Sequence, residues 1–281
     1  MLKFPAGTNH PLRLLYKNVL KFVINPKSKR TSHVAIDVLI PVAEKDLNTL
    51  PAVIYFARKN ILNPINKIYI AGRAGVTEEI CKNTGCIFIN ESDALPIDKS
   101  DIIYNGTEWF RSGWLFQQLI KLNADAITDS ENVLVLDADT CLVKKQSFVL
   151  DDGSFILNFG DEYHSPYKSY TKLTQLKKRF FLSFVCHHMI FNKTILTCLK
   201  NDIELHTGQN WISAILSYMD YTDSSGFSEY ELYGNYLYYN FRSKVKLEYW
   251  YNKPGSKFLP SIKDYSGYNG KYKSVSIHNY Q

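Results

Sequence analysis

Between residues 35 and 91 the sequence alternates between two hydrophobic patterns, and this alternation limits the folds that the chain can adopt. The segments AIDVLIPV, INKIYIAG and CIFINE are nearly continuous apolar runs, which are typical of buried strands. Between them, LPAVIYFARKNI and VTEEICKNTG have apolar residues at helical spacing, and the connections are short. Strands that alternate with helices predict a parallel sheet covered by helices. We therefore expect an α/β fold of the nucleotide-binding type.

The same pattern continues to about residue 145 and then changes. RSGWLFQQLIKLNA predicts an amphipathic helix, and NVLVLDADTCLV predicts a strand that is buried on both faces. From residue 151 onward the chain is richer in polar and aromatic residues, without a linker or a repeat. We expect an N-terminal arm, residues 1–33, and a single domain, residues 34–281, whose halves are residues 34–150 and 151–281.

The basic residues are concentrated in the N-terminal arm. The net charge is +6, but no acidic residue precedes Asp37, whereas seven basic residues do. The remainder of the chain has 26 basic and 27 acidic residues, a net charge of −1. The basic character therefore does not indicate a surface for nucleic acid, and no nucleic-acid partner is expected.

The arm also predicts a basic amphipathic helix, because Leu15, Tyr16 and Val19 are near helical spacing with lysines mostly on another face. Such a helix lies either on an anionic membrane surface or against its own domain, and the sequence leaves both alternatives open. No apolar run is long enough to span a bilayer, and the five cysteines form no C-x-x-C pair. We expect a cytoplasmic protein, or one that residues 1–30 hold peripherally at the inner face of the membrane.

Two aspartates, Asp137 and Asp139, stand at the end of the apolar run NVLVL. Residues two apart on a strand point the same way, and ligands of open α/β sheets bind just outside the carboxyl ends of the strands. Two carboxylates at this place suit Mn²⁺ or Mg²⁺, which keep coordination positions for phosphate oxygens. The alternative is that the aspartates cap a turn after a buried strand.

The segment VLVLDAD, which a helix precedes, lies about 100 residues after a strand-helix-strand start. In this it resembles the GT-A fold of nucleotide-sugar glycosyltransferases, above all glycogenin-like and bacterial surface-polysaccharide enzymes, over residues 35–145. The resemblance implies a mostly parallel sheet, with a nucleotide-sugar half and an acceptor half. It also implies that Asp137 and Asp139 hold a divalent metal on the donor's diphosphate. The donor's nucleotide would then lie at the end of the first strand, at Pro41, Val42 and Ala43.

The helix before the aspartates offers further contacts for a donor. A diphosphate with one divalent metal still carries negative charge, so a cation is expected near it. Arg111, Gln117 and Lys121 are the candidates. Gln117 and Lys121 share a helix face as an i, i+4 pair, whereas Gln118 is expected off to the side. The alternative for Lys121 is an ordinary surface charge.

Histidines are the candidates for a third metal ligand. Glycogenin-like enzymes have a histidine near the chain end, and the resemblance carries this role to His278 in KSVSIHNYQ, although the residues that follow it in those enzymes are absent here. His187 and His188 would point to opposite faces of a strand, so at most one of them faces the cleft. We take His188 as the alternative ligand. A histidine without a ligand role is the other interpretation of both sites.

The segment SEYE, residues 228–231, predicts the start of a helix. Ser228 and Glu231 have the spacing of a capping box, which gives Glu231 a structural role. Inverting GT-A enzymes commonly have an acidic pair at the start of a late helix, and by this similarity Glu229 is the first candidate for the catalytic base and Glu231 the second. Two solvated glutamates are the alternative.

We therefore expect a metal-dependent glycosyltransferase that moves a sugar, most simply from a UDP-sugar, to a glycan or lipid-linked acceptor in bacterial cell-surface polysaccharide synthesis. Two alternatives stay open. A sugar-nucleotide nucleotidyltransferase would use a similar acidic site, but the first strand lacks the glycine-rich loop that it normally needs. A non-catalytic carbohydrate-binding protein of the same fold is the other.

Overall fold

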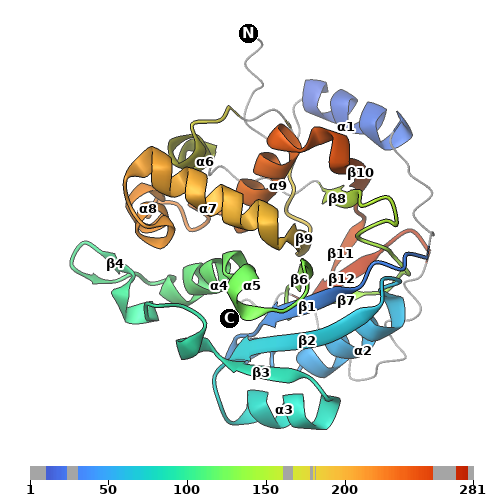
Figure 1. The fold of residues 1–281 in the computed structure, drawn as a ribbon, viewed down its shortest axis with the longest axis horizontal. Helices are drawn as coiled ribbons and strands as arrows, with labels where there is room; N and C mark the ends of the chain where they lie inside the picture. Colours follow the sequence, from blue (N-terminus) through green and yellow to red (C-terminus); the bar gives the residue numbers. More distant parts are fainter. Residues whose placement is uncertain are drawn as a thin grey trace.

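The computed structural model describes residues 11–23, 31–160, 167–177, 180, 182–255 and 270–277 (Figure 1). Its central sheet has five strands in the order β3-β2-β1-β6-β9. β1, β2, β3 and β6 are parallel, and β9 is antiparallel to β6. The predicted α/β fold with a mainly parallel sheet is confirmed. The strands are β1 (Ile36–Pro41), β2 (Ile65–Gly72), β3 (Ile87–Asn90), β6 (Asn132–Leu136) and β9 (His188–Asn192).

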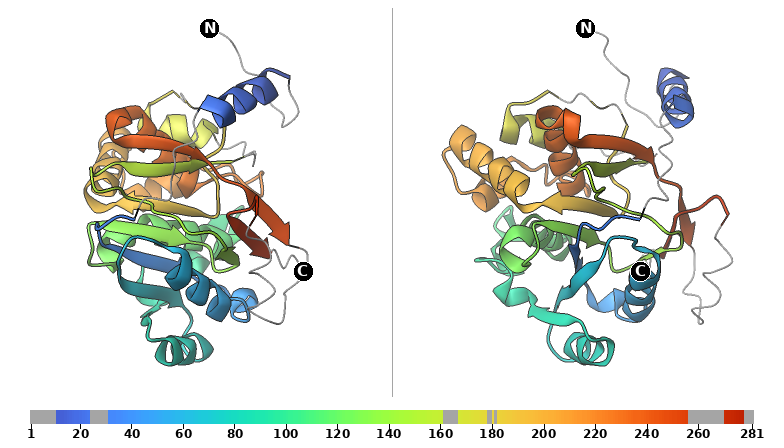
Figure 2. Two further views of the ribbon diagram at one scale, coloured as in Figure 1. Left: turned by 90° about the vertical axis from the view of Figure 1, so that its right-hand side faces the viewer. Right: turned by 45° about the vertical axis from the view of Figure 1, so that its right-hand side comes forward.

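Helices cover both sides of this sheet, which is why its central strands are mostly apolar. Every residue of β1 is buried. Helices α2 and α3 lie on one side of the sheet, and α7 and α9 lie on the other (Figures 1 and 2). Gly85 ends α3 in the left-handed conformation, with φ 63°, which glycine adopts without steric cost. The helices are α2 (Leu50–Asn60), α3 (Val76–Thr84), α4 (Ser112–Leu122), α5 (Ala124–Ile127), α6 (Tyr167–Thr174), α7 (Lys193–Thr207), α8 (Trp211–Tyr218) and α9 (Glu229–Asn240).

The chain breaks out of the central sheet at the two aspartates. NVLVLDADTCLV was expected to be one strand, but β6 ends at Leu136 and a separate strand β7 (Thr140–Leu142) follows. The backbone N–H of Thr140 donates to the carbonyl oxygen of Asp137 at 3.1 Å, so residues 137–139 form a turn. β7 then pairs with β12 (Ser274–Ile277), which also pairs with β11 (Asn252–Gly255). The turn thereby places both aspartates between two sheets.

The remaining strands form smaller pairs. β8 (Phe155–Phe159) and β10 (Val245–Tyr249) pair in parallel, and β4 (Ile103–Tyr104) and β5 (Thr107–Glu108) form an antiparallel hairpin. Aromatic residues fill much of this half, as the stacked rings of Phe180 and Phe184 show, with centroids 4.4 Å apart.

The predicted N-terminal helix is present as α1 (Pro11–Val23), which lies beside β10. Tyr16 and Leu20 are half-buried against the core, whereas Leu15 and Val19 are 60% and 50% exposed. The helix therefore packs on its own domain with one apolar pair and presents a second apolar pair to solvent. Among the helices that the structure describes, none has both the length and the hydrophobicity to cross a bilayer.

Candidate functional site

Two adjoining pockets lie at the carboxyl ends of the parallel strands. The smaller, of about 370 Å³, is lined by both aspartates, and the larger, of about 710 Å³, extends past the ends of β1 and β2. We call them the acidic pocket and the basic pocket. Four residues line both pockets and so form their boundary: Lys45, Arg111, Trp114 and Gln117.

The centre of the acidic pocket is a cluster of Asp137, Asp139 and His187. One ligand atom from each of them lies within 4.8 Å of the others. The antiparallel register of β6 and β9, which pairs Leu136 with His188, continues one step further, and the backbone N–H of Asp137 donates to the carbonyl oxygen of His187 at 3.0 Å. His187 has φ 61°, and its Nδ1 lies 3.2 Å from Oδ2 of Asp137. Strand pairing and a left-handed residue thus bring the histidine to the aspartates.

These three side chains fit a divalent metal. Two carboxylates and one imidazole provide the oxygen and nitrogen donors that suit Mn²⁺ in particular, and Mg²⁺ through the carboxylates. Asp139 is further fixed by its neighbours, because Thr140 Oγ1 donates to its Oδ1 at 3.0 Å and Ile277 N–H donates to its carbonyl oxygen at 2.8 Å. A turn cap alone does not require a histidine at the same place.

Lys121 lies beside this cluster, with its side chain only 7% exposed. Its Nζ is 2.7 Å from Oδ1 of Asp137 and 2.8 Å from Oε1 of Glu229. Burial favours the neutral amine, but the two carboxylates outweigh burial and raise the pKa of Lys121. Burial likewise opposes ionisation of Asp137, but Lys121 and His187 outweigh it, and the pKa of Asp137 is lowered. Lys121 is therefore a charged residue of the site and not a surface lysine.

Glu229 is the first residue of α9 and is 1% exposed. Burial raises its pKa, Lys121 opposes this, and Asp137 adds to it. With its amide nitrogen turned toward the carboxylate, Gln118 donates to Oε1 of Glu229 at 2.8 Å. Tyr230 donates its hydroxyl to Oδ1 of Asp137 at 2.7 Å. Glu229 therefore lines the acidic pocket as part of a hydrogen-bonded group and is not solvated.

The other predicted donor contacts each line at least one of the two pockets. Val42 and Ala43 line the basic pocket, Pro41 lines the acidic pocket, and Arg111 and Gln117 line both. The charged lining of the basic pocket consists of four cations and two acids: Lys45, Arg73, Lys99, Arg111, Glu44 and Glu91. An excess of positive charge next to the cluster of Asp137, Asp139 and His187 suits an anionic ligand that spans the two pockets.

Some predicted residues lie elsewhere. The carboxylate of Glu231 accepts hydrogen bonds from the backbone N–H of Phe184 at 3.3 Å and from Asn235 at 2.8 Å, and Glu231 does not line either pocket. Ser228 Oγ accepts from the backbone N–H of Glu231 at 3.2 Å, which is one of the two hydrogen bonds of the predicted capping box. His278 lies outside the described residues.

His188, the alternative ligand, is also outside the cluster. It is 1% exposed, and its ring nitrogens lie 2.8 Å from the carbonyl oxygen of Cys186 and 3.0 Å from Oδ1 of Asn158. As expected, no more than one of the two histidines lines the acidic pocket, but it is His187, which lies just before β9 and has a left-handed backbone, so strand alternation is not the reason. Gln118 was expected off to the side and instead lines the acidic pocket.

His188 gives the protein a predicted sensitivity to acid. Burial lowers its pKa from 6.5 to about 3. Below pH 6.5 the unfolded chain therefore binds a proton at this histidine, whereas the folded chain does not until about pH 3. The free energy of unfolding consequently decreases as the pH is lowered from 6.5 toward 3. From pH 7 to pH 5 this histidine should cost about 2 kcal/mol of the free energy of unfolding.

Urea unfolding of the wild type and of His188→Asn at both pH values measures this difference. The pH dependence of the variant should be smaller by about 2 kcal/mol. His206→Asn is the matched control, since His206 is exposed on α7. Equal pH dependence of His188→Asn and the wild type would contradict the prediction.

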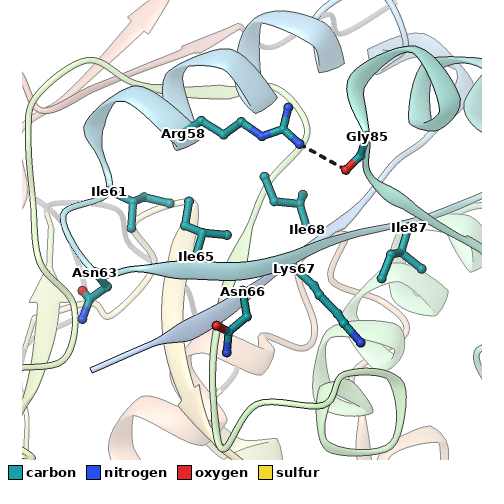
Figure 3. A pocket seen from close by; sticks show the side chains of 9 residues that line it. All are labelled: Arg58, Ile61, Asn63, Ile65, Asn66, Lys67, Ile68, Gly85 and Ile87. Carbon is teal, nitrogen blue, oxygen red and sulfur yellow. Dashed lines mark hydrogen bonds between the residues drawn. The ribbon is translucent and has the colours of Figure 1, made fainter. Parts of the chain in front are cut away.

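Another hollow, also of about 370 Å³, lies against β2, α2 and the start of β3 (Figure 3). Isoleucines form much of its wall, and Nη2 of Arg58 donates to the carbonyl oxygen of Gly85 at 3.2 Å. Lys67 lies at its edge. None of the predicted site residues lines this hollow.

Comparison with protein families identifies a relationship for most of the chain. Residues 76–273, more than half of the sequence, match the model of a family of unknown function, DUF6492. The chain belongs to this family. No curated protein matches this DUF6492 sequence.

Solved structures resemble this DUF6492 chain at low sequence identity. The galactosyltransferase LgtC, in complex with donor and acceptor sugar analogs, is 14% identical and has a TM-score of 0.44, covering 86% of this chain and 87% of that one. Glucosyl-3-phosphoglycerate synthase from Mycobacterium tuberculosis, with Mn²⁺, uridine-diphosphate and phosphoglyceric acid, is 12% identical with a TM-score of 0.37. That second match covers 62% of each chain, less than two thirds. Since both TM-scores are below 0.5, the functional conclusion has to come from the residues of the site.

Proposed function

We propose that this protein is a metal-dependent glycosyltransferase that uses a nucleotide-diphosphate sugar, most simply a UDP-sugar. One observation carries the proposal: Asp137, Asp139 and His187 meet at the carboxyl end of a mainly parallel sheet, next to a pocket with excess positive charge. Ligands of open α/β sheets bind at this edge. A diphosphate on a divalent metal has the size and charge to join the two pockets.

The charged residues are distributed as such a donor requires. Asp137 and Asp139 with His187 would hold Mn²⁺ or Mg²⁺, which when bound supplies charge stabilisation to the departing diphosphate. Lys45 and Arg111, at the boundary of the pockets, would face the remaining negative charge. The nucleoside would lie in the basic pocket, between the ends of β1 and β2 and the start of α4.

Two buried side chains would act on the reacting sugar. Lys121 lies within 2.8 Å of two carboxylates, so its ammonium is held at the floor of the acidic pocket, where it would contact the donor. Glu229 would accept the proton of the acceptor hydroxyl, since burial raises its pKa toward the range of a useful base. Glu231 does not line the pocket, which makes Glu229 the better candidate of the two.

Calorimetric titration of the wild type with UDP, with and without Mn²⁺, tests the proposal. We expect binding that requires the metal. Binding of a nucleoside triphosphate together with release of pyrophosphate from a sugar phosphate would instead favour a nucleotidyltransferase. Sugar binding that is indifferent to chelation would favour a non-catalytic carbohydrate-binding protein.

The acceptor is proposed to be a glycan or lipid-linked sugar of a bacterial cell surface, reached at the inner face of the membrane. Helix α1 supports a peripheral location, because Leu15 and Val19 are exposed in an arm that has basic residues and no acidic ones before Asp37. An exposed apolar pair within a basic segment suits the surface of an anionic bilayer.

Sedimentation with phosphatidylglycerol vesicles measures this contact. Leu15→Ser with Val19→Ser should weaken partitioning by on the order of 10-fold, because two apolar side chains no longer enter the bilayer. Leu205→Ser is the control, since Leu205 is 79% exposed on α7. Equal sedimentation of the double variant and the wild type would remove the membrane from the proposal.

A further inference from the structure

Phe110 is an aromatic side chain that the fold leaves open to a pocket. It lies just before α4, lines the basic pocket, and is 79% exposed. Val76, at the start of α3, lines the same pocket and is 56% exposed. Exposed apolar patches rimmed by polar residues mark interaction sites, among them ligand-binding grooves. The pocket therefore combines an apolar rim with a charged lining.

The backbone around Phe110 is firmly held, although its ring is open. Trp109 is 3% exposed, its backbone N–H donates to the carbonyl oxygen of Ile102 at 2.8 Å, and its indole N–H donates to that of Tyr221 at 3.2 Å. On the other side, Nη1 of Arg111 donates to the carbonyl oxygen of Ser224. The rings of Trp109 and Phe110 meet edge to face, with centroids 5.4 Å apart and an angle of 67°. Phe110 is thus presented on an anchored segment.

The charged residues of the basic pocket indicate which class of ligand would contact the Phe110 ring. The basic pocket has four cations against two acids, which disfavours an uncharged lipid chain and favours a ligand with an anionic part. Arg111, next to Phe110, is shared with the acidic pocket, where the diphosphate is proposed to lie. In a nucleotide the ribose separates the base from the diphosphate, so with the diphosphate at this boundary the planar base would lie within the basic pocket, which Phe110 lines. Stacking on an aromatic ring accepts every base, because each has a π-face.

We propose that Phe110 stacks on the nucleobase of the donor and is a main determinant of nucleotide affinity. This inference rests on the proposed function and assigns the residue that would recognise the base. Val76 would enclose the base from the side of α3. Because stacking has little sequence preference, discrimination between bases would come from the polar lining of the same pocket and not from Phe110.

The test compares ligands with and without a base, in the presence of Mn²⁺. UDP, GDP, ADP and inorganic pyrophosphate are titrated into the wild type, Phe110→Ala, Phe110→Trp and the control Leu205→Ala, whose side chain is equally exposed on α7. We expect Phe110→Ala to weaken the binding of the nucleotide by about 5- to 100-fold. Pyrophosphate binding should not change, and Phe110→Trp should retain nucleotide affinity.

The outcomes separate this inference from the proposed function. Equal nucleotide affinity of Phe110→Ala and the wild type would overturn the stacking role while leaving the donor site intact. An equal loss of pyrophosphate and nucleotide affinity in Phe110→Ala would show an effect on the phosphates and overturn the assignment to the base. Absence of binding of all three nucleotides to the wild type would overturn the proposed function and this inference together.

Discussion

Asp139→Asn should abolish the dependence of UDP binding on Mn²⁺ and lower any sugar-transfer rate by on the order of 1,000-fold. A metal that neutralises a departing diphosphate supplies several kcal/mol of transition-state stabilisation, which corresponds to that factor. Asp139 is better suited to this test than Asp137, because Asp137 also pairs with Lys121 and accepts from Tyr230. Calorimetry with UDP, with and without Mn²⁺, and a radiolabelled-sugar assay give the two measurements.

The control for this substitution is Asp93→Asn, since Asp93 is exposed and lines neither pocket. Its UDP binding should equal that of the wild type. Thermal unfolding of both variants shows whether the fold is retained. Mn²⁺-dependent binding of UDP to Asp139→Asn with wild-type affinity would remove Asp139 from the proposed metal site.

The parts of the site that sequence could predict are those that regular secondary structure positions. Asp137 and Asp139 follow an apolar strand, and the carboxyl ends of parallel strands meet at one edge of the sheet. Gln117 and Lys121 are four residues apart on a helix, so their common direction follows from helical geometry. For these residues, the predicted strand or helix was sufficient to predict a position at the pockets, which they line in the structure.

The position of His187, by contrast, depends on tertiary structure. His187 reaches Asp137 because β9 runs antiparallel to β6 and because residue 187 has φ 61°, which is uncommon for any residue with a side chain. Nothing in FVCHHMIFNK indicates that backbone conformation. His188 was equally plausible from the sequence, and only the packing of β8 against β9 gives it Asn158 as a neighbour.

The glutamates show the same limit. Glu229 and Glu231 are both in the first turn of α9 and both are buried. The capping-box spacing ranked Glu229 first, but it did not indicate which carboxylate lines the pocket. The loop that contains Phe184 separates them, because the backbone N–H of Phe184 donates to the carboxylate of Glu231. Gln118 was misplaced for a similar reason, since the start of α9 lies against α4 and brings Glu229 to it.

Lys121→Met should reduce the free energy of unfolding by about 3–5 kcal/mol, because it leaves the carboxylates of Glu229 and Asp137 together without their shared cation. Methionine keeps the length and apolar stem of lysine, so the loss is chiefly electrostatic. Adding Glu229→Gln removes one of the two carboxylates and should restore a large part of the stability. Urea unfolding of the two single variants and the double variant gives the coupling energy directly.

The affinity for UDP distinguishes a functional role of Lys121 from a purely structural one. Lys200→Met is the matched control, because Lys200 is similarly enclosed, with its side chain 11% exposed, and pairs with Asp125 on α5. Both lysine variants should lose stability, but only Lys121→Met should also lose UDP affinity. Unchanged UDP affinity of Lys121→Met would make Lys121 a structural residue.

Glu229→Gln should keep UDP affinity while turnover falls by roughly 100- to 10,000-fold, since an amide does not accept the proton of the acceptor hydroxyl. Unchanged turnover of Glu229→Gln would remove Glu229 from the proton transfer.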